Sequence, residues 1–324
     1  MVRSAVVAVL TILTASLASA QLRMELSLDR SSAVQCEPMS LVISWQNMSE
    51  TPLMLGELDP TKNGAVSLEI DGKSVTMPLL RTPAPLYLNC TETGLQPGVK
   101  KEGTIPLIAL VLEPGTHKFK AEATFRGQEK THFDGAVESD MARLMITAPE
   151  GEDLRALEYI RRDLHSKGLS GETLNLGTCQ VLTQDPKVFG DILELFPDSI
   201  YAAWIVMSYF ARPDVYEPRV VKEMLDSESW PLPNAVPGTR INAQRQLHGK
   251  ARARWEIQWG ERILTVHPDF ARRETLRLEL AVDYLILGRK KDGLRLLKQL
   301  ASEGKPETQS RWAESFLGLY TKSR

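Results

Sequence analysis

The sequence predicts two folded domains of different class, an all-β sandwich over residues 21–148 followed by an all-α region of helical hairpins over 149–324. Apolar residues recur at every second position before Pro149 and at every third or fourth position after it. These rhythms are typical of half-buried strands and of amphipathic helices. The chain has 324 residues, which suits two domains of roughly 100 to 200 residues each. Its 43% hydrophobic and 25% charged residues indicate a folded, water-soluble protein.

Residues 1–20 have the pattern of a secretory signal peptide. Arg3 supplies the positive charge, residues 5–13 form an apolar run, and an Ala-Ser-Ala motif ends at Ala20. We therefore expect cleavage between Ala20 and Gln21 and a mature protein that is secreted or periplasmic. No later apolar run approaches the roughly 18 residues that a membrane helix needs, so no integral membrane segment is expected after cleavage.

The strands of the first domain are predicted from alternating apolar residues. These are Met24, Leu26 and Leu28; Leu41, Ile43 and Trp45; Val66, Leu68 and Ile70; and Phe119, Ala121, Ala123 and Phe125. Asp71-Gly72 separates the third run from a strand that begins near Ser74, and Asp-Gly is the signal for a type I′ hairpin because both residues must adopt positive φ. Pro and Gly residues between 78 and 98 indicate long connections, and a closing strand is expected at 141–146. Such a series of short strands predicts a sandwich.

Two short motifs carry a resemblance to a known class of sandwich. Glu37-Pro38 before a Leu-x-Ile-x-Trp strand, followed by Asn47-x-Ser49, is similar to the second strand of immunoglobulin-like domains of bacterial exported proteins. The Leu112-x-Pro114-Gly115-x-His117 turn resembles the corner before the sixth strand of fibronectin-type-III and related sandwiches. The resemblance implies an Ig-like fold for most of residues 22–148.

About eight helices are predicted in the second domain, after a linker at Pro149-Glu150-Gly151. Pro197-Asp198-Ser199 is expected to cap one of them, and prolines 231, 233 and 237 interrupt the series. The residues that recur at helical spacing are Leu154, Leu157, Ile160 and Leu164; Ile192 and Phe196; Ile200, Ala203, Trp204, Met207 and Phe210; Leu247, Ala251, Trp255, Trp259 and Ile263; Leu276, Leu280 and Tyr284; Leu294, Leu297 and Leu300; and Trp312, Phe316 and Tyr320.

The junctions between these helices repeat. Phe196-Pro197-Asp198 recurs as His267-Pro268-Asp269 and, more loosely, as Lys305-Pro306-Glu307, with proline separations of 71 (268 − 197) and 38 (306 − 268). A period of about 34 residues with Pro at the helix start is typical of tetratricopeptide repeats. The segment from Tyr284 through Gly288, Gly293, Leu297 and Leu300 to Pro306 resembles the second half of that repeat. An irregular helical bundle is the alternative.

The chain has three cysteines, in a predicted compartment where disulfides persist. Cys36 and Cys90 both fall in the first domain, so a disulfide between them is one expectation and two unpaired thiols are the other. Cys179 would then be left over. It is expected to be a small buried residue, or a nucleophile if His165 or His248 lies beside it.

No pattern of catalytic, metal-binding or cofactor-binding residues stands out, so none is assigned. The five histidines, His117, His132, His165, His248 and His267, are scattered and form no HExxH motif. No glycine-rich phosphate loop or nucleophile elbow occurs. The basic residues between Arg240 and Arg254, among them Lys250 and Arg252, are expected to form a solvated helix face, or else to bind an acidic partner. The formal net charge of −2 argues against a nucleic-acid partner.

The sequence therefore favours an exported, non-catalytic scaffold whose helical half binds a protein or peptide at the cell envelope. Trp204, Tyr209, Trp255 and Trp259 are either groove residues or core residues. The alternative is an exported hydrolase or a carbohydrate-binding accessory protein with a site assembled from residues far apart in sequence. A sugar-binding sandwich that uses Trp45 or Tyr87 belongs to that alternative, and it requires those rings to be exposed.

Overall fold

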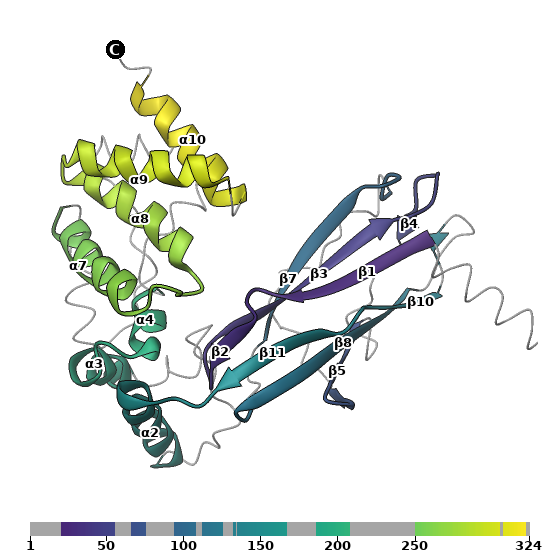
Figure 1. The fold of residues 1–324 in the computed structure, drawn as a ribbon, viewed down its shortest axis with the longest axis horizontal. Coiled ribbons are helices and arrows are strands. Elements are labelled where there is room, and N and C mark those ends of the chain that lie inside the picture. Colours follow the sequence, from purple (N-terminus) through teal and green to yellow (C-terminus); the bar gives the residue numbers. More distant parts are fainter. Residues whose placement is uncertain are drawn as a thin grey trace, which may run out of the picture. The chain divides into compact units, whose positions relative to one another are not determined.

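The computed structural model describes residues 21–55, 66–75, 94–107, 112–125, 132–133, 135–166, 186–207, 250–304 and 307–321. The chain divides into two compact units with the boundary between Ala148 and Pro149. The first unit is rich in β-sheet and the second is helical (Figure 1). The predicted signal peptide at residues 1–20, with its cleavage site at Ala20, lies outside the described residues and stays a prediction.

Two largely antiparallel sheets make up most of the first unit (Figure 1). The smaller sheet has the order β1 (Leu22–Leu28), β3 (Met39–Asn47) and β7 (Lys100–Leu107). The larger sheet has the order β2 (Ser32–Val34), β11 (Ala142–Thr147), β8 (Gly115–Phe125), β5 (Val66–Ile70) and β6 (Lys73–Val75), and β10 (Gly135–Glu138) also pairs with β8. The short β2 runs parallel to its neighbour, β11. A separate parallel pair joins β4 (Met54–Leu55) to β9 (His132–Phe133).

Aromatic side chains connect the two larger sheets. Trp45 of β3 meets Phe125 of β8 edge to face, with ring centroids 5.3 Å apart, and Phe125 meets Phe133 in the same way at 5.5 Å. Trp45 and Phe125 are fully buried. Aromatic residues remove large apolar areas from water and prefer this edge-to-face geometry. Sheets whose inner faces meet in such a core are compatible with a β-sandwich.

The predicted Asp-Gly hairpin is confirmed. β5 and β6 pair with Ile70 opposite Lys73, and Asp71 and Gly72 adopt φ values of 52° and 79°. The sequence did not predict β7, which pairs along β3 from Gln46↔Lys100 to Met39↔Leu107. This strand opens on charged residues and so lacks the alternation that marks a half-buried strand.

The second unit has seven helices in the part of the chain that is described. They are α2 (Gly151–Ser166), α3 (Pro186–Leu195), α4 (Ile200–Met207), α7 (Lys250–Val266), α8 (Arg273–Ile286), α9 (Lys290–Glu303) and α10 (Glu307–Thr321). From α7 to α10 each helix packs against the next. Helix α8 begins at Arg273 and helix α10 begins at Glu307. The α8–α9 pair, together with the turn after each helix, therefore extends from Arg273 to the residue before Glu307.

Helix α4 differs from its predicted amphipathic form. The sequence predicted one apolar stripe that includes Ile200 and Trp204, but every residue of the helix is buried. A helix that is apolar all round is buried all round, and periodicity alone does not reveal this. The predicted cap is confirmed, because the Ser199 hydroxyl accepts a hydrogen bond of 3.1 Å from the Ala202 N–H.

Helices α8 and α9 approach closely because residue 293 has no side chain. A Cβ atom placed on Gly293 would lie 2.7 Å from the carbonyl oxygen of Ala281 and 2.8 Å from Cγ of Leu285. The carbonyl belongs to the backbone of α8, so it cannot move out of the way as a flexible side chain can. Leu278, Ala281, Leu297, Leu300 and Phe316 form a common core of α8, α9 and α10.

We expect Gly293→Ala to destabilise the helical unit by about 1–3 kcal/mol, since overpacking against the α8 backbone exceeds the gain of roughly 1 kcal/mol from alanine's higher helix propensity. Gly318→Ala on α10 is the matched control, because no described atom lies within 4 Å of its added Cβ. That variant should gain up to about 1 kcal/mol. Chemical denaturation followed by helical circular dichroism measures both changes, and equal effects would show that α8 and α9 are not in close contact here.

Candidate functional site

In the described part of the helical unit, helices α7 and α8 carry a group of buried charged side chains. Arg252 and Glu256 lie one turn apart on α7, and Glu279 and Asp283 lie one turn apart on α8. Their residues are only 6%, 1%, 2% and 4% exposed, respectively. Both Nε and Nη2 of Arg252 lie 2.8 Å from Oε1 of Glu256. We call these four residues the acid cluster.

The acid cluster holds three carboxyl groups and one guanidinium group. Burial raises the pKa of Asp283 well above the ordinary value of an aspartate, and the neighbouring carboxyls of Glu256 and Glu279 raise this pKa further. Burial also raises the pKa of Glu256, although the guanidinium of Arg252 opposes this. Buried carboxyl groups with raised pKa values are a mark of functional sites, and also of structural ion networks.

The expectation that Arg252 lies on a solvated face was wrong. Its side chain is buried against Glu256. Lys250 and Arg254 at neighbouring positions of α7 are exposed, as expected, and Arg240 lies outside the described residues. The start of α7 therefore carries two kinds of basic residue. Lys250 and Arg254 face solvent, whereas Arg252 compensates the buried carboxylate of Glu256.

A second polar group lies where α7 and α8 meet the α8–α9 turn. The Tyr284 hydroxyl donates a hydrogen bond to Glu261 of α7, and the guanidinium of Arg289 lies 4.3 Å from the centroid of the Tyr284 ring. Burial and the hydrogen bond to Glu261 raise the pKa of Tyr284 to about 12. The tyrosine is therefore a neutral hydrogen-bond donor at physiological pH, and it is not poised as an acid or a nucleophile.

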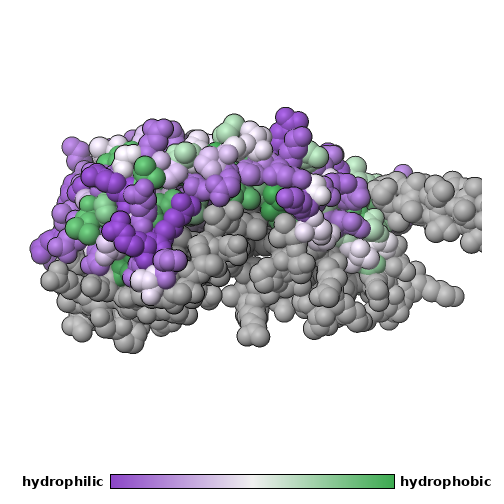
Figure 2. Space-filling view, turned by 90° about the horizontal axis from the view of Figure 1, so that it is seen from below, coloured by the Kyte–Doolittle hydropathy of each residue, from purple (hydrophilic) through white to green (hydrophobic). Residues whose placement is uncertain are grey.

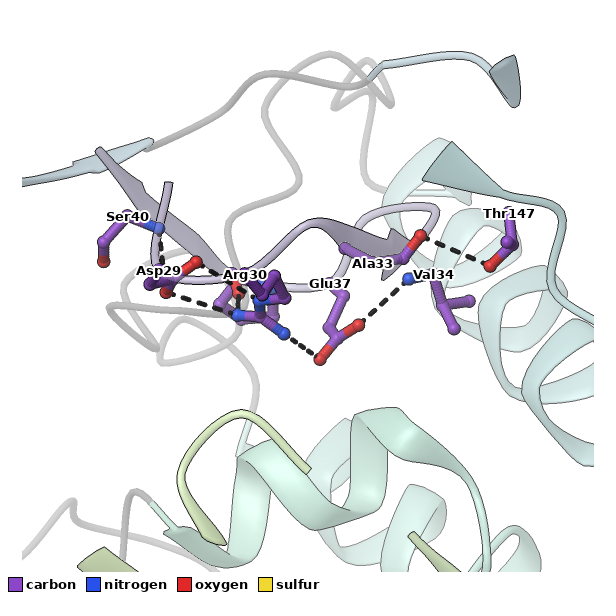
Figure 3. A network of polar contacts seen from close by, with 8 residues as sticks. Asp29, Arg30, Ala33, Val34, Glu37, Ser40 and Thr147 are labelled. Atoms are coloured by element: carbon purple, nitrogen blue, oxygen red, sulfur yellow. Dashed lines mark hydrogen bonds and ion pairs between the residues drawn. The ribbon is translucent and has the colours of Figure 1, made fainter. Parts of the chain in front are cut away.

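The sheet unit has a polar network around the turn between β2 and β3 (Figure 3). Arg30 donates hydrogen bonds to the carboxylate of Glu37 and the carbonyl of Pro38, and it pairs with Asp29 at 3.2 Å. The other oxygen of Glu37 accepts a hydrogen bond of 2.9 Å from the N–H of Val34. These contacts close the turn on itself, so we assign the network to structure and not to ligand binding.

Cys36 lies in this turn, where its φ of 65° is in the left-handed region that non-glycine residues rarely adopt. Its side chain is partly buried. Cys90 and Cys179 lie outside the described residues, so the predicted Cys36–Cys90 disulfide stays a prediction.

Among the described residues, His117 and His267 form hydrogen bonds within the fold, and His117 does so through both ring nitrogens. Nδ1 of His117 lies 2.7 Å from Oδ2 of Asp71, and Nε2 lies 2.7 Å from the carbonyl oxygen of Glu113. Partial burial lowers the pKa of His117, but these two acceptors outweigh that effect and raise it. Because both ring nitrogens face acceptors, the ring favours the imidazolium and has no nitrogen left to act as a base.

Two further histidines, His267 and His165, lie among the described residues. Nε2 of His267 lies 2.9 Å from the carbonyl oxygen of Asp198, and His165 is exposed on α2. His248 and Cys179 lie outside the described residues. Of the hypothetical pair of Cys179 with His165 or His248, the structure therefore describes His165 alone. Among the residues that the structure covers, no three His, Cys, Asp or Glu side chains form a group that could hold a metal ion. In the same residues, no helix is long and apolar enough to cross a membrane.

Of the candidate aromatic residues, Trp45 and Trp204 are core residues. Trp45 is fully buried and does not offer a sugar-binding face, whereas Tyr87 and Tyr209 lie outside the described residues. Trp204 packs against Phe270 with ring centroids 5.1 Å apart. Trp255 and Trp259 are partly buried, with ring centroids 6.2 Å apart on one side of α7.

Asn47, which with Met48 and Ser49 matches the Asn-x-Ser pattern of a glycan acceptor, makes hydrogen bonds within the fold. Its Nδ2 donates to the carbonyl oxygens of Leu95 and Thr51 at 2.6 Å and 2.8 Å, and its Oδ1 accepts from the N–H and hydroxyl of Ser49. The residue is fully buried. Its amide nitrogen is therefore not accessible to a glycan in the folded unit.

Comparisons with known proteins give weak likenesses alone. No family model matches the chain, and no curated protein matches it. Among solved structures, it is similar to the CARDB domain of the PF1109 protein from Pyrococcus furiosus, in complex with di-metal ions, at a TM-score of 0.23 and 9% identity over 40% of this chain and 97% of that one. It is also similar to the sporulation control protein Spo0M from Bacillus subtilis, at a TM-score of 0.25 and 10% identity over 44% and 55%. Likeness at this level supports no inference about activity or ligands.

Proposed function

We propose that this chain is an exported, non-catalytic scaffold, with an Ig-like sandwich as its first unit, and that its helical unit binds a protein or peptide at the cell envelope. The observation that carries the proposal is the stack of α7 to α10, in which each helix packs on the next and the α8–α9 pair extends from Arg273 to the start of α10 at Glu307. This length matches the period of about 34 residues of tetratricopeptide repeats, whose stacked pairs present extended surfaces to polypeptides.

The exposed side of α9 suggests the charge of the partner. Lys291, Arg295 and Lys298 are exposed at helical spacing, and no ion pair joins any of them to another described residue. By contrast, Asp292 pairs with Arg289 and Glu303 pairs with Arg277 at the ends of the same helix. We therefore propose that the partner is a polypeptide segment rich in acidic side chains, since such a segment complements this basic face.

Much of the described surface that is visible in Figure 2 is hydrophilic, with apolar residues in small patches. Among the described residues, the large apolar side chains that are exposed are spread over both units; they are Met48, Val99, Met141, Met145, Leu154, Leu195 and Val266. Single exposed apolar residues are normal on a protein surface. Charge is therefore the better guide to a partner than apolar area.

Fluorescence anisotropy of the 21–324 chain with labelled acidic, neutral and basic peptides tests the proposal. We expect binding of the acidic peptides alone, weakened by salt, and a loss of at least about tenfold in the triple variant Lys291→Glu, Arg295→Glu, Lys298→Glu. The matched control reverses three exposed charges on α2, Arg155→Glu, Arg161→Glu and Arg162→Glu. If no peptide binds and the chain instead cleaves or retains members of a glycan library, the scaffold proposal is wrong and the hydrolase or accessory-protein alternative holds.

A further inference from the structure

His117 connects three parts of the sheet unit. The residue lies near the start of β8, and its Nδ1 lies 2.7 Å from Oδ2 of Asp71 in the β5–β6 turn. Its Nε2 lies 2.7 Å from the carbonyl oxygen of Glu113. Glu113 belongs to residues 112–114, which lead into β8 and which we call the corner. The His117 side chain is only 14% exposed, so the ring is largely enclosed between these two acceptors.

Both contacts can be hydrogen bonds only while the ring is an imidazolium. A neutral imidazole has a single N–H, and its other nitrogen is an acceptor. An acceptor nitrogen that faces a carbonyl or carboxylate oxygen forms no hydrogen bond with it, because neither atom has a hydrogen to donate. When His117 loses its proton, one of the two contacts is therefore lost.

Asp71 determines which contact that is. Its Oδ1 accepts a hydrogen bond of 2.9 Å from the Lys118 N–H, and its own N–H donates to the Lys118 carbonyl at 3.0 Å. The hydrogen bonds from Lys118 and His117 lower the pKa of Asp71, so its carboxylate is ionised near neutral pH. A charged acceptor holds the remaining N–H more strongly than a neutral carbonyl does. The neutral ring therefore keeps its bond to Asp71 and gives up its bond to Glu113.

Among the described residues, the charge that acts on the His117 ring is that of Asp71. Strands β1, β5, β10 and β11 pack against β8. Successive side chains of a strand point to opposite faces. The charged residues of three of these strands are in register with even-numbered residues of β8, on the face away from His117; the pairs are Glu69↔Lys120, Glu138↔Glu122 and Arg143↔Lys118.

The remaining neighbours leave the charge of the ring unopposed. On β11, the residue opposite His117 is the buried Leu144. On β1, the charged residues Arg23 and Glu25 pair with each other at 3.2 Å. In the corner, the Glu113 carboxylate accepts a hydrogen bond of 3.2 Å from the Gln35 amide.

We propose that His117 is a proton-controlled latch, which ties the corner to β8 while the ring is charged and releases the corner when the ring becomes neutral. This regulation goes beyond the proposed binding function and does not depend on it. Because an ordinary histidine has a pKa of about 6.5, such a latch responds to pH close to neutrality.

The direction of the pH effect follows from linkage. Partial burial lowers the pKa of His117, but the Glu113 carbonyl and the Asp71 carboxylate outweigh this effect and raise it. The latched state therefore binds the proton more tightly than the released state, in which the pKa is about 6.5. The latch contributes its full stability below about pH 6.5 and loses it as the pH rises through the raised pKa of the latched state.

NMR of the 21–324 chain from pH 5 to 9 tests the latch. The ring nitrogens of His117 should report an imidazolium at low pH and the Nδ1–H tautomer at high pH. The backbone amide signals of Leu112, Glu113 and Gly115 should shift with the same midpoint. Hydrogen exchange of these amides, corrected for intrinsic rates, should accelerate by up to about tenfold per pH unit while the proton is being lost.

Two substitutions of His117 separate its two contacts. The amide of His117→Gln reaches about as far as Nε2, whereas the amide of His117→Asn reaches about as far as Nδ1. Neither amide titrates, so exchange in the corner should be independent of pH in both variants. Exchange should be slow in His117→Gln, which keeps a donor for Glu113, and in His117→Asn as fast as in the wild type at high pH. His267→Gln in the helical unit is the matched control and should keep the wild-type profile.

Asp71→Asn tests the charged acceptor itself. This variant keeps an oxygen for the Lys118 N–H but removes the negative charge, so the midpoint of the His117 titration should move to lower pH. The wild-type titration needs no substitution, which keeps the test decisive where a variant folds poorly. A His117 ring that titrates at or below pH 6.5, or corner amides whose shifts and exchange do not follow the ring, would overturn the latch.

Discussion

Arg252→Met is expected to destabilise the helical unit by about 3–5 kcal/mol at neutral pH, because the change leaves the buried carboxylate of Glu256 without a compensating charge. The guanidinium donates to Glu256 from both Nε and Nη2, and the methionine that replaces it has no donor. Chemical denaturation followed by helical circular dichroism measures the loss. The loss should shrink toward pH 4, where the carboxyl groups can take up protons instead.

Arg254→Met is the matched control, since Arg254 is exposed two positions further along α7. A surface substitution of this kind usually changes stability by less than about 0.5 kcal/mol. The double variant Arg252→Met, Glu256→Gln should recover much of the loss, because removing both charges of a buried pair is far less costly than removing one. If Arg252→Met and Arg254→Met prove equally mild, Arg252 is not the compensating charge of the acid cluster.

Local patterns explain why some of the fold was predictable. The Asp71-Gly72 pair is enough to predict the hairpin from Val66 to Val75, and Ser199 is enough to predict the cap of α4. The pairing of β3 with β7 was not predictable in this way. Strand β7 lies far along the chain from β3, and its first residues are charged, so it lacks the alternation of apolar residues that predicts a strand. Pairing over such distances is decided by the whole fold, so it leaves no local mark.

The acid cluster was missed for a related reason. Arg252 and Glu256 are spaced four apart, and a pair at this spacing is usually a surface ion pair. Burial of this pair depends on Glu279 and Asp283, which arrive on a different helix. One signal was present in the sequence, because Asp283 falls between the apolar Leu280 and Tyr284 of the predicted core stripe. A carboxyl group beside a core stripe marks either a helix edge or a buried acid, and only coordinates distinguish the two.

Asn47→Asp is expected to destabilise the sheet unit by about 3–5 kcal/mol at neutral pH, since it places a buried charge without compensation. The Asn47 nitrogen donates to the carbonyl oxygens of Leu95 and Thr51 at 2.6 Å and 2.8 Å, and an aspartate oxygen in its place would face both with no hydrogen to donate. Hydrogen exchange of the β1 and β3 amides measures the effect. Gln46→Glu is the matched control, because its amide lies on the adjacent position of β3 and makes an exposed hydrogen bond to the Gly98 carbonyl.

The pH dependence of Asn47→Asp distinguishes the cost of burying a charge from the cost of losing the asparagine side chain's own contacts. Burial and the two facing carbonyls would raise the pKa of the new carboxyl group, so the folded state would bind the extra proton and lose stability as the pH rises above about 3.9. Lowering the pH should restore part of the protection of β1 and β3, since a protonated carboxyl can donate to one of the two carbonyls. Asn47→Ala keeps no titratable group, so its loss should be independent of pH. Equal pH profiles for the aspartate and alanine variants would show that the two carbonyls are not turned toward residue 47.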